Sequence, residues 1–343
     1  MKYDYLIVGA GFFGATFARL ATDAGKTCLV MDSRPHIGGN AYSKKIEGID
    51  IHVYGPHIFH TNDDDIWSFV NRFTKFNNFI LSPKLQSGGK LYSLPFNMNT
   101  FYELWGCTKP EEAKAIIESQ KLKLDRPAKN LEEQALSMIG KDLYELIVRD
   151  YTKKQWKKDP KDLPASIIKR LPIRFEFDNN YFNDKYQGIP VNGYTKMFEN
   201  MLEDIETIID ENYFDNRDHW NSMADTVVFT GKIDEYFGYE FGELEYRTLE
   251  FQHELLDTDN YQGVAVVNYA SLDITREIPT AWNKDKVPYY PINDDRNTEI
   301  FRKYREKADS LPNVIFGGRL SEYRYYDMHQ VIGSAMATYK KHK

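Results

Sequence analysis

The stretch Tyr3–Asp32, YDYLIVGAGFFGATFARLATDAGKTCLVMD, decides the fold class. An apolar run, a glycine turn, an amphipathic stretch and a second apolar run predict a strand, a helix and a second strand. Gly9 allows the tight turn, Gly11 lets backbone N–H groups approach a pyrophosphate, and Gly14 lets the helix pack closely on the strand. Asp32 is placed to bind a ribose hydroxyl. The stretch predicts a dinucleotide-binding domain, and a purely structural glycine turn is the alternative.

A second glycine turn follows at once, in DSRPHIGGN, Asp32–Asn40. A plain NAD-binding fold does not need glycines at this point. In flavoproteins of the glutathione-reductase and amine-oxidase type, a glycine pair just after the ribose-binding acid lets the chain pass close to FAD. The pair Gly38–Gly39 resembles that turn, and it predicts FAD as the cofactor rather than FMN or NAD.

Composition limits the function classes. The 343 residues suffice for two or three packed domains, and 42% hydrophobic and 28% charged residues are typical of a soluble globular protein. A formal charge of −7 argues against nucleic acid or an anionic membrane as a partner. Cys28 and Cys107 can form neither a disulfide framework nor a four-ligand metal site, so no metal is expected. The N-terminus enters a strand without a signal peptide, which predicts a cytoplasmic protein.

Two later segments resemble returns to the first sheet. ADTVVFTGKID, 224–234, reads as a buried strand, and NVIFGG, 313–318, reads as a strand and turn before a C-terminal helix that Asp327 caps. We therefore expect an α/β protein with a discontinuous, Rossmann-like FAD-binding domain, an inserted helical domain and an antiparallel β-sheet domain. The predicted boundaries are 1–95, 195–235 and 311–343 for FAD binding, 96–160 for the helices, and 161–194 with 236–310 for the substrate sheet.

Local patterns predict several elements of the insertions. Thr108 with Glu111, and Asn130 with Glu133, have the spacing of a capping box, and the second helix is expected to continue through residue 156. YRTLEFQHELL, 246–256, and YQGVAVVNY, 261–269, show the alternation of strands.

An aromatic and arginine series follows the second predicted helix. Tyr151 and Trp156, then Arg170 and Arg174, then Tyr181 combine a stacking surface with guanidinium forks for a diphosphate. The series predicts a metal-free site for a nucleoside diphosphate. Taken singly, the residues have ordinary alternatives, such as a packing role for Trp156.

The sequence resembles the bacterial UDP-galactopyranose mutases. The resemblance covers nearly the whole chain in order, in GNAYSKKIEGIDIHVYGPHIFHTND, LPFNMNTFYELWG, YTKKQWKK, RLPIRFEFDNNYF, YQGIPVNGYTKM, LEYRTLEF, PYYPIND and FGGRLSEYRYYDMHQVI. It implies a homodimer that isomerises UDP-galactopyranose to UDP-galactofuranose through a covalent adduct of reduced flavin N5 with the anomeric carbon. No net redox change occurs, and no protein nucleophile is needed.

The resemblance also implies roles for single residues. The catalytic set is Arg170, His57 and His60, with packing as the alternative for the two histidines. The substrate-binding set is Tyr151, Trp156, Arg170, Arg174, Tyr181, Arg247, Tyr290, Tyr325 and Asp327. The cofactor-binding set is Gly9, Gly11, Phe12, Phe13, Gly14, Asp32, Gly39, Asn40, His57, His60, Arg319, Tyr326, Asp327 and Met328.

One departure from the family pattern stands out. In the family, a segment of about twenty residues separates two strands that VVNYASLDITREIP, 266–279, joins directly, so a deletion is expected near 270–274. Arg276 matches the later strand and not the family's second diphosphate arginine, which is therefore expected to be missing. The missing segment makes a flavoprotein that binds UDP-sugar with little turnover an alternative to a working mutase. An amine-oxidase-like flavin oxidoreductase is a lesser alternative, because it shares the FAD turns but does not explain the aromatic and arginine series.

Overall fold

The computed structural model describes residues 2–156, 158–168, 173–270, 277–280 and 286–343. The chain divides into two compact units. Residues 80–95 lie in the same unit as the helical insertion, and much of 280–310 lies in the same unit as the first sheet. Both placements differ from the predicted boundaries. The division into three domains stays a prediction. Unit 1 comprises Met1–Phe79, Asp184–Leu249 and Thr280–Lys343, and unit 2 comprises Ile80–Asn183 and Glu250–Pro279.

Unit 1 is built on a five-stranded sheet in which neighbouring strands pair in parallel. The predicted returns of the chain to this sheet are confirmed, because residues 224–229 and 314–316 pair successively beside the first strand. The strands, in sheet order, are β15 (Val314–Phe316), β10 (Ala224–Phe229), β1 (Tyr3–Val8), β2 (Cys28–Met31) and β9 (Glu206–Ile208).

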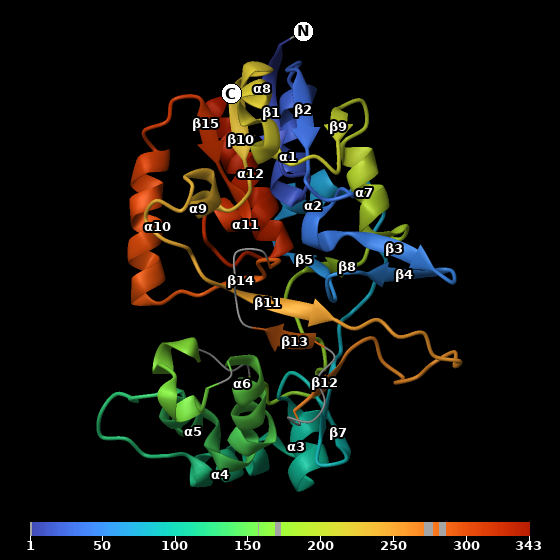
Figure 1. Ribbon diagram of the computed structural model, residues 1–343. Helices are drawn as coiled ribbons and strands as arrows, with labels where there is room; N and C mark the ends of the chain where they lie inside the picture. The colour runs from blue at the N-terminus through green and yellow to red at the C-terminus, as the bar shows by residue number, and fades with distance from the viewer. Residues whose placement is uncertain (1, 157, 169–172, 271–276, 281–285) are drawn as a thin grey trace. The chain divides into compact units, whose positions relative to one another are not determined.

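Hydrophobic cores cover both faces of this sheet. Successive strand residues point to opposite faces, so Ile7 joins one core and Leu6 the other. On the Ile7 side, the ring of Phe17 lies 5.2 Å from Tyr5 and 5.4 Å from Tyr339. Burial on both faces explains why β1 and β2 are continuous apolar runs. The first core packs α1 (Phe12–Asp23) beside α12 (Met328–His342), as Figure 1 shows in blue and red.

The other elements of unit 1 surround the sheet. The chain forms a β3–β4 hairpin, pairs β5 with β8, and pairs β11 with β14, all antiparallel. Their bounds are β3 (Ser43–Ile46), β4 (Ile49–His52), β5 (Phe59–Thr61), α2 (Asp64–Val70), β8 (Tyr186–Gly188), α7 (Gly193–Met201), α8 (Arg217–Ser222), α9 (Ile233–Tyr236), β11 (Tyr246–Phe251), β14 (Tyr290–Pro291), α10 (Asp295–Ala308) and α11 (Gly318–Ser321).

Unit 2 packs helices and a small sheet around a separate core. The sheet pairs β6 antiparallel with β7 and parallel with β12, and β13 lies at the boundary between the units. The predicted strand over 261–269 is therefore confirmed only for its last three residues. The bounds are β6 (Lys84–Ser87), β7 (Lys90–Ser93), α3 (Met98–Trp105), α4 (Pro110–Gln120), α5 (Leu131–Leu143), α6 (Arg149–Trp156), β12 (Val267–Tyr269) and β13 (Glu277–Thr280).

The helix predictions for unit 2 need two corrections. The acid that closes the start of α4 is Glu112 and not Glu111, because its carboxylate accepts the N–H groups of Thr108 and Lys109. Asn130 caps α5 as predicted and accepts the N–H of Glu133 at 2.9 Å. The expected continuous helix is interrupted at Gly140 by a left-handed φ of 77°, and a π-helical turn over Tyr144–Val148 precedes α6.

Candidate functional site

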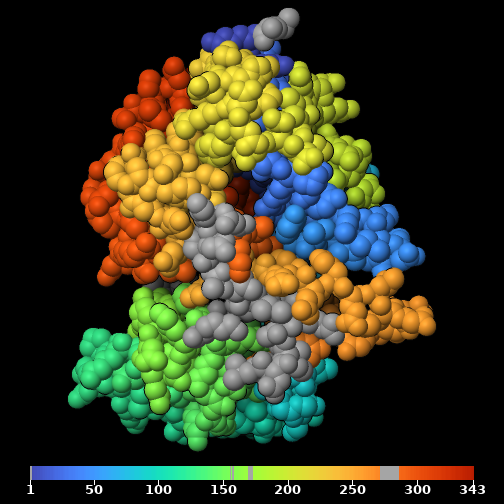
Figure 2. Space-filling model, in the orientation of Figure 1, coloured from blue at the N-terminus to red at the C-terminus, as the bar shows by residue number. Residues whose placement is uncertain are grey.

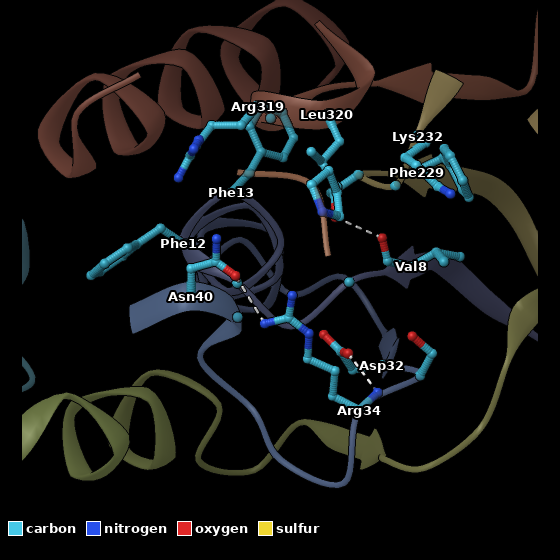
Figure 3. A pocket seen from close by; sticks show the side chains of 18 of the residues that line it. Val8, Phe12, Phe13, Asp32, Arg34, Asn40, Phe229, Lys232, Arg319 and Leu320 are labelled. Carbon is cyan, nitrogen blue, oxygen red and sulfur yellow. Dashed lines mark hydrogen bonds between the residues drawn. The ribbon is translucent and has the colours of Figure 1, made fainter. Parts of the chain in front are cut away.

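A cavity of about 450 Å³ lies at the carboxyl ends of β1, β2 and β10. Its lining includes the last residue of each strand, Val8, Met31 and Phe229, and the loops that follow them (Figure 3). Figure 2 shows a hollow between the yellow residues around 210–220 and the blue N-terminal residues. Open α/β sheets bind their ligands at such an edge, where connections from the central strand diverge.

The first glycine turn has the geometry that the sequence predicts. Gly9 has a φ of +113°, and a Cβ there would overlap Thr230 Oγ1. A Cβ on Gly14 would overlap the carbonyl oxygen of Gly9 and lie 2.9 Å from Ile7 Cγ2. The helix α1 can therefore approach β1 only because position 14 has no side chain.

The second glycine pair faces the first turn. Gly38 and Gly39 have φ values of +91° and +55°, in the left-handed region that favours glycine. A Cβ on Gly39 would lie 3.3 Å from Gly11 Cα. The second turn needs glycine because its backbone passes close to that of Gly11 at the N-terminus of α1, and Gly11 and Gly39 both line the cavity.

Asp32 lies at the edge of the cavity and is held by the backbone. Its Oδ2 accepts the N–H of Ala10 at 2.8 Å, and its Oδ1 accepts the N–H of Arg34 at 2.9 Å. The Arg34 guanidinium donates to Asn40 Oδ1 at 3.0 Å, as Figure 3 shows. Arg34 also lines the cavity, and sequence reasoning missed it, although its position two residues after Asp32 was a signal.

Arg319, on α11, supplies a second cation. One of its terminal nitrogens donates to the Tyr289 carbonyl, and its Nε is buried without a hydrogen-bond partner among the described residues. A Cβ on Gly317 would overlap the ring of Phe13, so the chain before Arg319 packs directly on α1. Backbone N–H groups and an incompletely satisfied guanidinium as donors, with a carboxylate as acceptor for a ribose hydroxyl, are the polar groups that a dinucleotide requires.

His57 is a partly buried neutral imidazole in the lining. Its Nδ1 lies 2.7 Å from the Gly55 carbonyl, which can only accept, so this nitrogen carries the proton. The backbone N–H of His57 donates to His52 Nδ1 at 3.0 Å, and Tyr194 donates to the His57 carbonyl. Burial lowers the pKa of His57 to about 4. Nε2 is therefore a hydrogen-bond acceptor at neutral pH.

This depressed pKa gives a prediction about stability. The unfolded chain protonates His57 near its ordinary pKa of about 6.5, so its contribution is complete above that pH and is lost as the pH falls towards 4. Between pH 7 and pH 5, we expect the protein to lose about 2 kcal/mol more unfolding free energy than a His57→Gln variant. Urea unfolding at both pH values measures the difference, and equal losses would contradict the assignment.

Other predicted site residues of unit 1 lie outside the cavity lining. The rings of Tyr290 and Tyr325 are 5.1 Å apart, and the Arg319 guanidinium lies 5.6 Å from the Tyr325 ring. Pairing of β11 with β14 sets Arg247 opposite Tyr290. Asp327 is the N-cap of α12, as predicted. Among the remaining predicted cofactor residues, the lining includes Phe12, Asn40, Tyr326 and Met328.

The predicted nucleotide residues in unit 2 occupy α6 and the loop beyond it. Trp156 is partly buried against the unit 2 core, whereas Tyr151 and Tyr181 are exposed. The Arg174 guanidinium donates to the carbonyls of Asn180 and Tyr181 and to the Asn183 side chain. These bonds hold the loop, and the use of Arg174 on a diphosphate stays a prediction. Arg170 and Arg276 lie outside the described residues.

Comparisons with known proteins bear on this site. The model of a family described as an NAD(P)-binding Rossmann-like domain matches residues 7–73, and that of UDP-galactopyranose mutase matches 146–276 and 271–325. The dTDP-fucopyranose mutase of Escherichia coli is 38% identical over 96% of both chains. The chain belongs to the UDP-galactopyranose mutase family.

A second relative agrees with this assignment. The probable UDP-galactopyranose mutase of Klebsiella pneumoniae is 38% identical over 98% of this chain and 93% of its own. A reduced UDP-galactopyranose mutase of known structure shares the fold, with a TM-score of 0.65, 13% identity, and coverage of 98% of this chain and 93% of its own. Family membership indicates a mutase-type isomerase with a flavin. Within the described residues, no helix is both long and apolar enough to span a membrane.

Proposed function

We propose that this chain is an FAD-dependent mutase that isomerises UDP-galactopyranose to UDP-galactofuranose. The observation that carries the proposal is the meeting of two glycine turns, at Gly11 and Gly39, beside Asp32 in a chain related to mutases over nearly its whole length. A second glycine turn suits the long adenosine-bearing flavin. The resemblance supports a homodimer in the cytoplasm, and analytical ultracentrifugation of the purified protein tests the dimer.

The residues of the cavity divide the work of holding the cofactor. The N–H groups at the start of α1 bind the pyrophosphate, Asp32 accepts a ribose hydroxyl, and Arg319 neutralises negative charge. His57 offers a fixed acceptor at Nε2 and, being neutral, adds no charge to the site. When bound and reduced, the flavin supplies the nucleophile for the anomeric carbon of the sugar.

The residues of unit 2 bind the nucleotide in this proposal. Tyr151 and Trp156 stack on the uracil, and Arg170 stabilises the negative charge of the departing diphosphate. Because the same diphosphate that leaves the sugar must bond to it again after the ring has changed, these residues would hold UDP throughout the reaction.

Chromatography of the reaction products tests the function. UDP-galactofuranose is incubated with dithionite-reduced protein, and conversion to UDP-galactopyranose is followed by HPLC, with unreduced protein as the control. Because one relative is named for dTDP-fucopyranose, dTDP-fucofuranose is tested in parallel. Conversion of neither sugar by reduced, flavin-loaded protein would contradict the proposal.

One observation favours a second candidate, a flavoprotein that binds UDP-sugar with little turnover. The family match falls into two segments that overlap at 271–276, where the sequence predicts a deletion. UDP binding without conversion of either sugar would support this candidate. Release of hydrogen peroxide with an amine substrate would instead support the oxidoreductase alternative.

Replacement of Trp156 tests the nucleotide site. We expect Trp156→Ala to weaken UDP binding by roughly 1–3 kcal/mol, the range for stacking of a base on an aromatic ring. Flavin content should not change, because the residues that line the cavity belong to unit 1. Trp156→Phe is the matched control, since it keeps an aromatic face and most of the packing on the unit 2 core. Isothermal titration with UDP measures the effect, and unchanged affinity would leave Trp156 with a packing role alone.

A further inference from the structure

The fold brings together three potential metal ligands from two distant parts of the sequence. His60 lies on β5, and Asp327 and His329 lie at the start of α12. One ligand atom from each lies within 4.8 Å of the others, and all three residues are partly buried. The rings of the two histidines are 5.0 Å apart. The two cysteines cannot form a four-ligand metal site, and the sequence therefore predicts no metal. His60, Asp327 and His329 offer nitrogen and oxygen ligands in place of thiolates.

A second carboxylate orients His60. The Nδ1 of His60 lies 2.5 Å from Asp184 Oδ2, and the other oxygen of Asp184 accepts a hydrogen bond from the Asn62 side chain. An ionised carboxylate can only accept, so it fixes the proton on Nδ1 and leaves the Nε2 lone pair to act as a ligand. Histidines that bind metals are held by the same kind of carboxylate partner, which fixes the ring and raises its basicity.

His329 provides an independent indication. Its Nδ1 is buried and has no hydrogen-bond partner within the described part of the chain. Buried polar atoms are rarely left unsatisfied, so an orphaned imidazole nitrogen beside a second histidine and a carboxylate requires an explanation. A bound cation would satisfy it.

We propose that His60, Asp327 and His329 form a binding site for one Zn²⁺ ion, with Asp184 as the positioning residue for His60. Two imidazoles and a carboxylate are a ligand set that suits zinc. Tetrahedral coordination at zinc–ligand lengths of about 2.0–2.2 Å places ligands roughly 3.4 Å apart, so binding draws the side chains together by about 1 Å. Three protein ligands leave the fourth position to water. The charges of Asp184 and Asp327 offset that of the ion.

The ion would join β5 to the N-terminus of α12. None of the three ligands belongs to the lining of the cavity described above. The family resemblance assigns His60 and Asp327 to the flavin and substrate site, and Tyr326 and Met328, the neighbours of Asp327, line the cavity, so the proposal places the ion beside that site.

Metal titration of the flavin-containing protein tests the site. Zn²⁺ is titrated by calorimetry, and Co²⁺ is titrated by its visible absorption, which reports tetrahedral coordination. We expect one equivalent to bind, His329→Ala to abolish that binding, and His219→Ala to leave it unchanged, because His219 is an exposed histidine on α8. Asp184→Asn should weaken affinity 10- to 100-fold with unchanged stoichiometry.

Thermal unfolding provides a second measurement of zinc binding, which can still be interpreted if a variant is less stable than the wild-type protein. Zn²⁺ should raise the Tm of the wild-type protein and of His219→Ala, each measured against its own metal-free form. It should not raise the Tm of His329→Ala. Absence of saturable binding to the wild-type protein would overturn the proposal. So would equal affinity in His329→Ala, or an unchanged affinity in Asp184→Asn.

Discussion

Replacement of Gly11 by alanine is expected to lower flavin affinity roughly 10- to 100-fold while the chain still folds. An added methyl group in a well-packed site costs about 1–3 kcal/mol, which corresponds to this loss of affinity. Gly11 has φ −82° and ψ −172°, which alanine also adopts, and the nearest atom to its Cβ, Gly39 Cα, would be 3.9 Å away. The protein itself therefore has room for the methyl group. That group would fill the space through which the pyrophosphate reaches the backbone of α1.

Two other glycine replacements provide the contrast. Gly14→Ala should cost about 3 kcal/mol or more of unfolding free energy as well as the flavin, because its Cβ collides with the backbone of the turn. Gly48→Ala, with a φ of +80° and open space around it, should cost about 1 kcal/mol and leave the flavin in place. Flavin fluorescence titration and urea unfolding measure the two quantities. Unchanged flavin affinity in Gly11→Ala would refute the proposed binding of the pyrophosphate by the backbone at the start of α1.

Insertion of a family-like segment between Tyr269 and Ile274 is expected to raise turnover with reduced flavin by about 10²–10³. The estimate follows from the loss caused by removing one donor from a site that stabilises a developing negative charge. A chain with Arg170 as its one diphosphate arginine should release UDP from the sugar slowly. Affinity for UDP should change much less, because Tyr151 and Trp156 hold the uracil in the proposed complex.

The control for this insertion is the same segment with its arginine replaced by alanine. It should restore little turnover, which separates the effect of the charge from that of added chain. Single-turnover HPLC assays and UDP titration measure the two quantities. If the present chain already had full mutase activity, and Arg276→Ala left it unchanged, the argument from the deletion would be wrong.

Local patterns in the sequence were enough to predict the strand, glycine turn, helix and strand of Tyr3–Asp32. The constraint on Gly14 is set by Ile7 and Gly9, which are close to it in the chain, whereas Gly9 contacts Thr230 and Gly11 faces Gly39. The predicted capping box at Thr108 failed by one position because Pro110 occupies the first turn of α4. A proline is favoured there, which makes Lys109 the N-cap and Glu112 the third helical residue.

Contacts between distant segments could not be predicted in this way. The residue at the break in α5, Gly140, is constrained by a different helix, because a Cβ there would lie 2.8 Å from Gln120 Cβ on α4. Arg34 becomes a cavity residue through its bond to Asn40 and its position over Tyr54. Residues 60 and 329 come together only when α12 packs against β5. Single-sequence periodicity carries no information about such pairs.

The order of strands in the five-stranded sheet also constrains how the protein is made. The central strand β1 is synthesised first, but β10 and β15, which complete one side of the sheet, come from residues 224–229 and 314–316. Arg319 and Met328, which line the cavity, follow later still. Nearly the whole chain must therefore emerge from the ribosome before all the residues that line the cavity are present. Until α12 is made, the core on one face of the sheet lacks that helix, and apolar surface left exposed in this way promotes aggregation during translation.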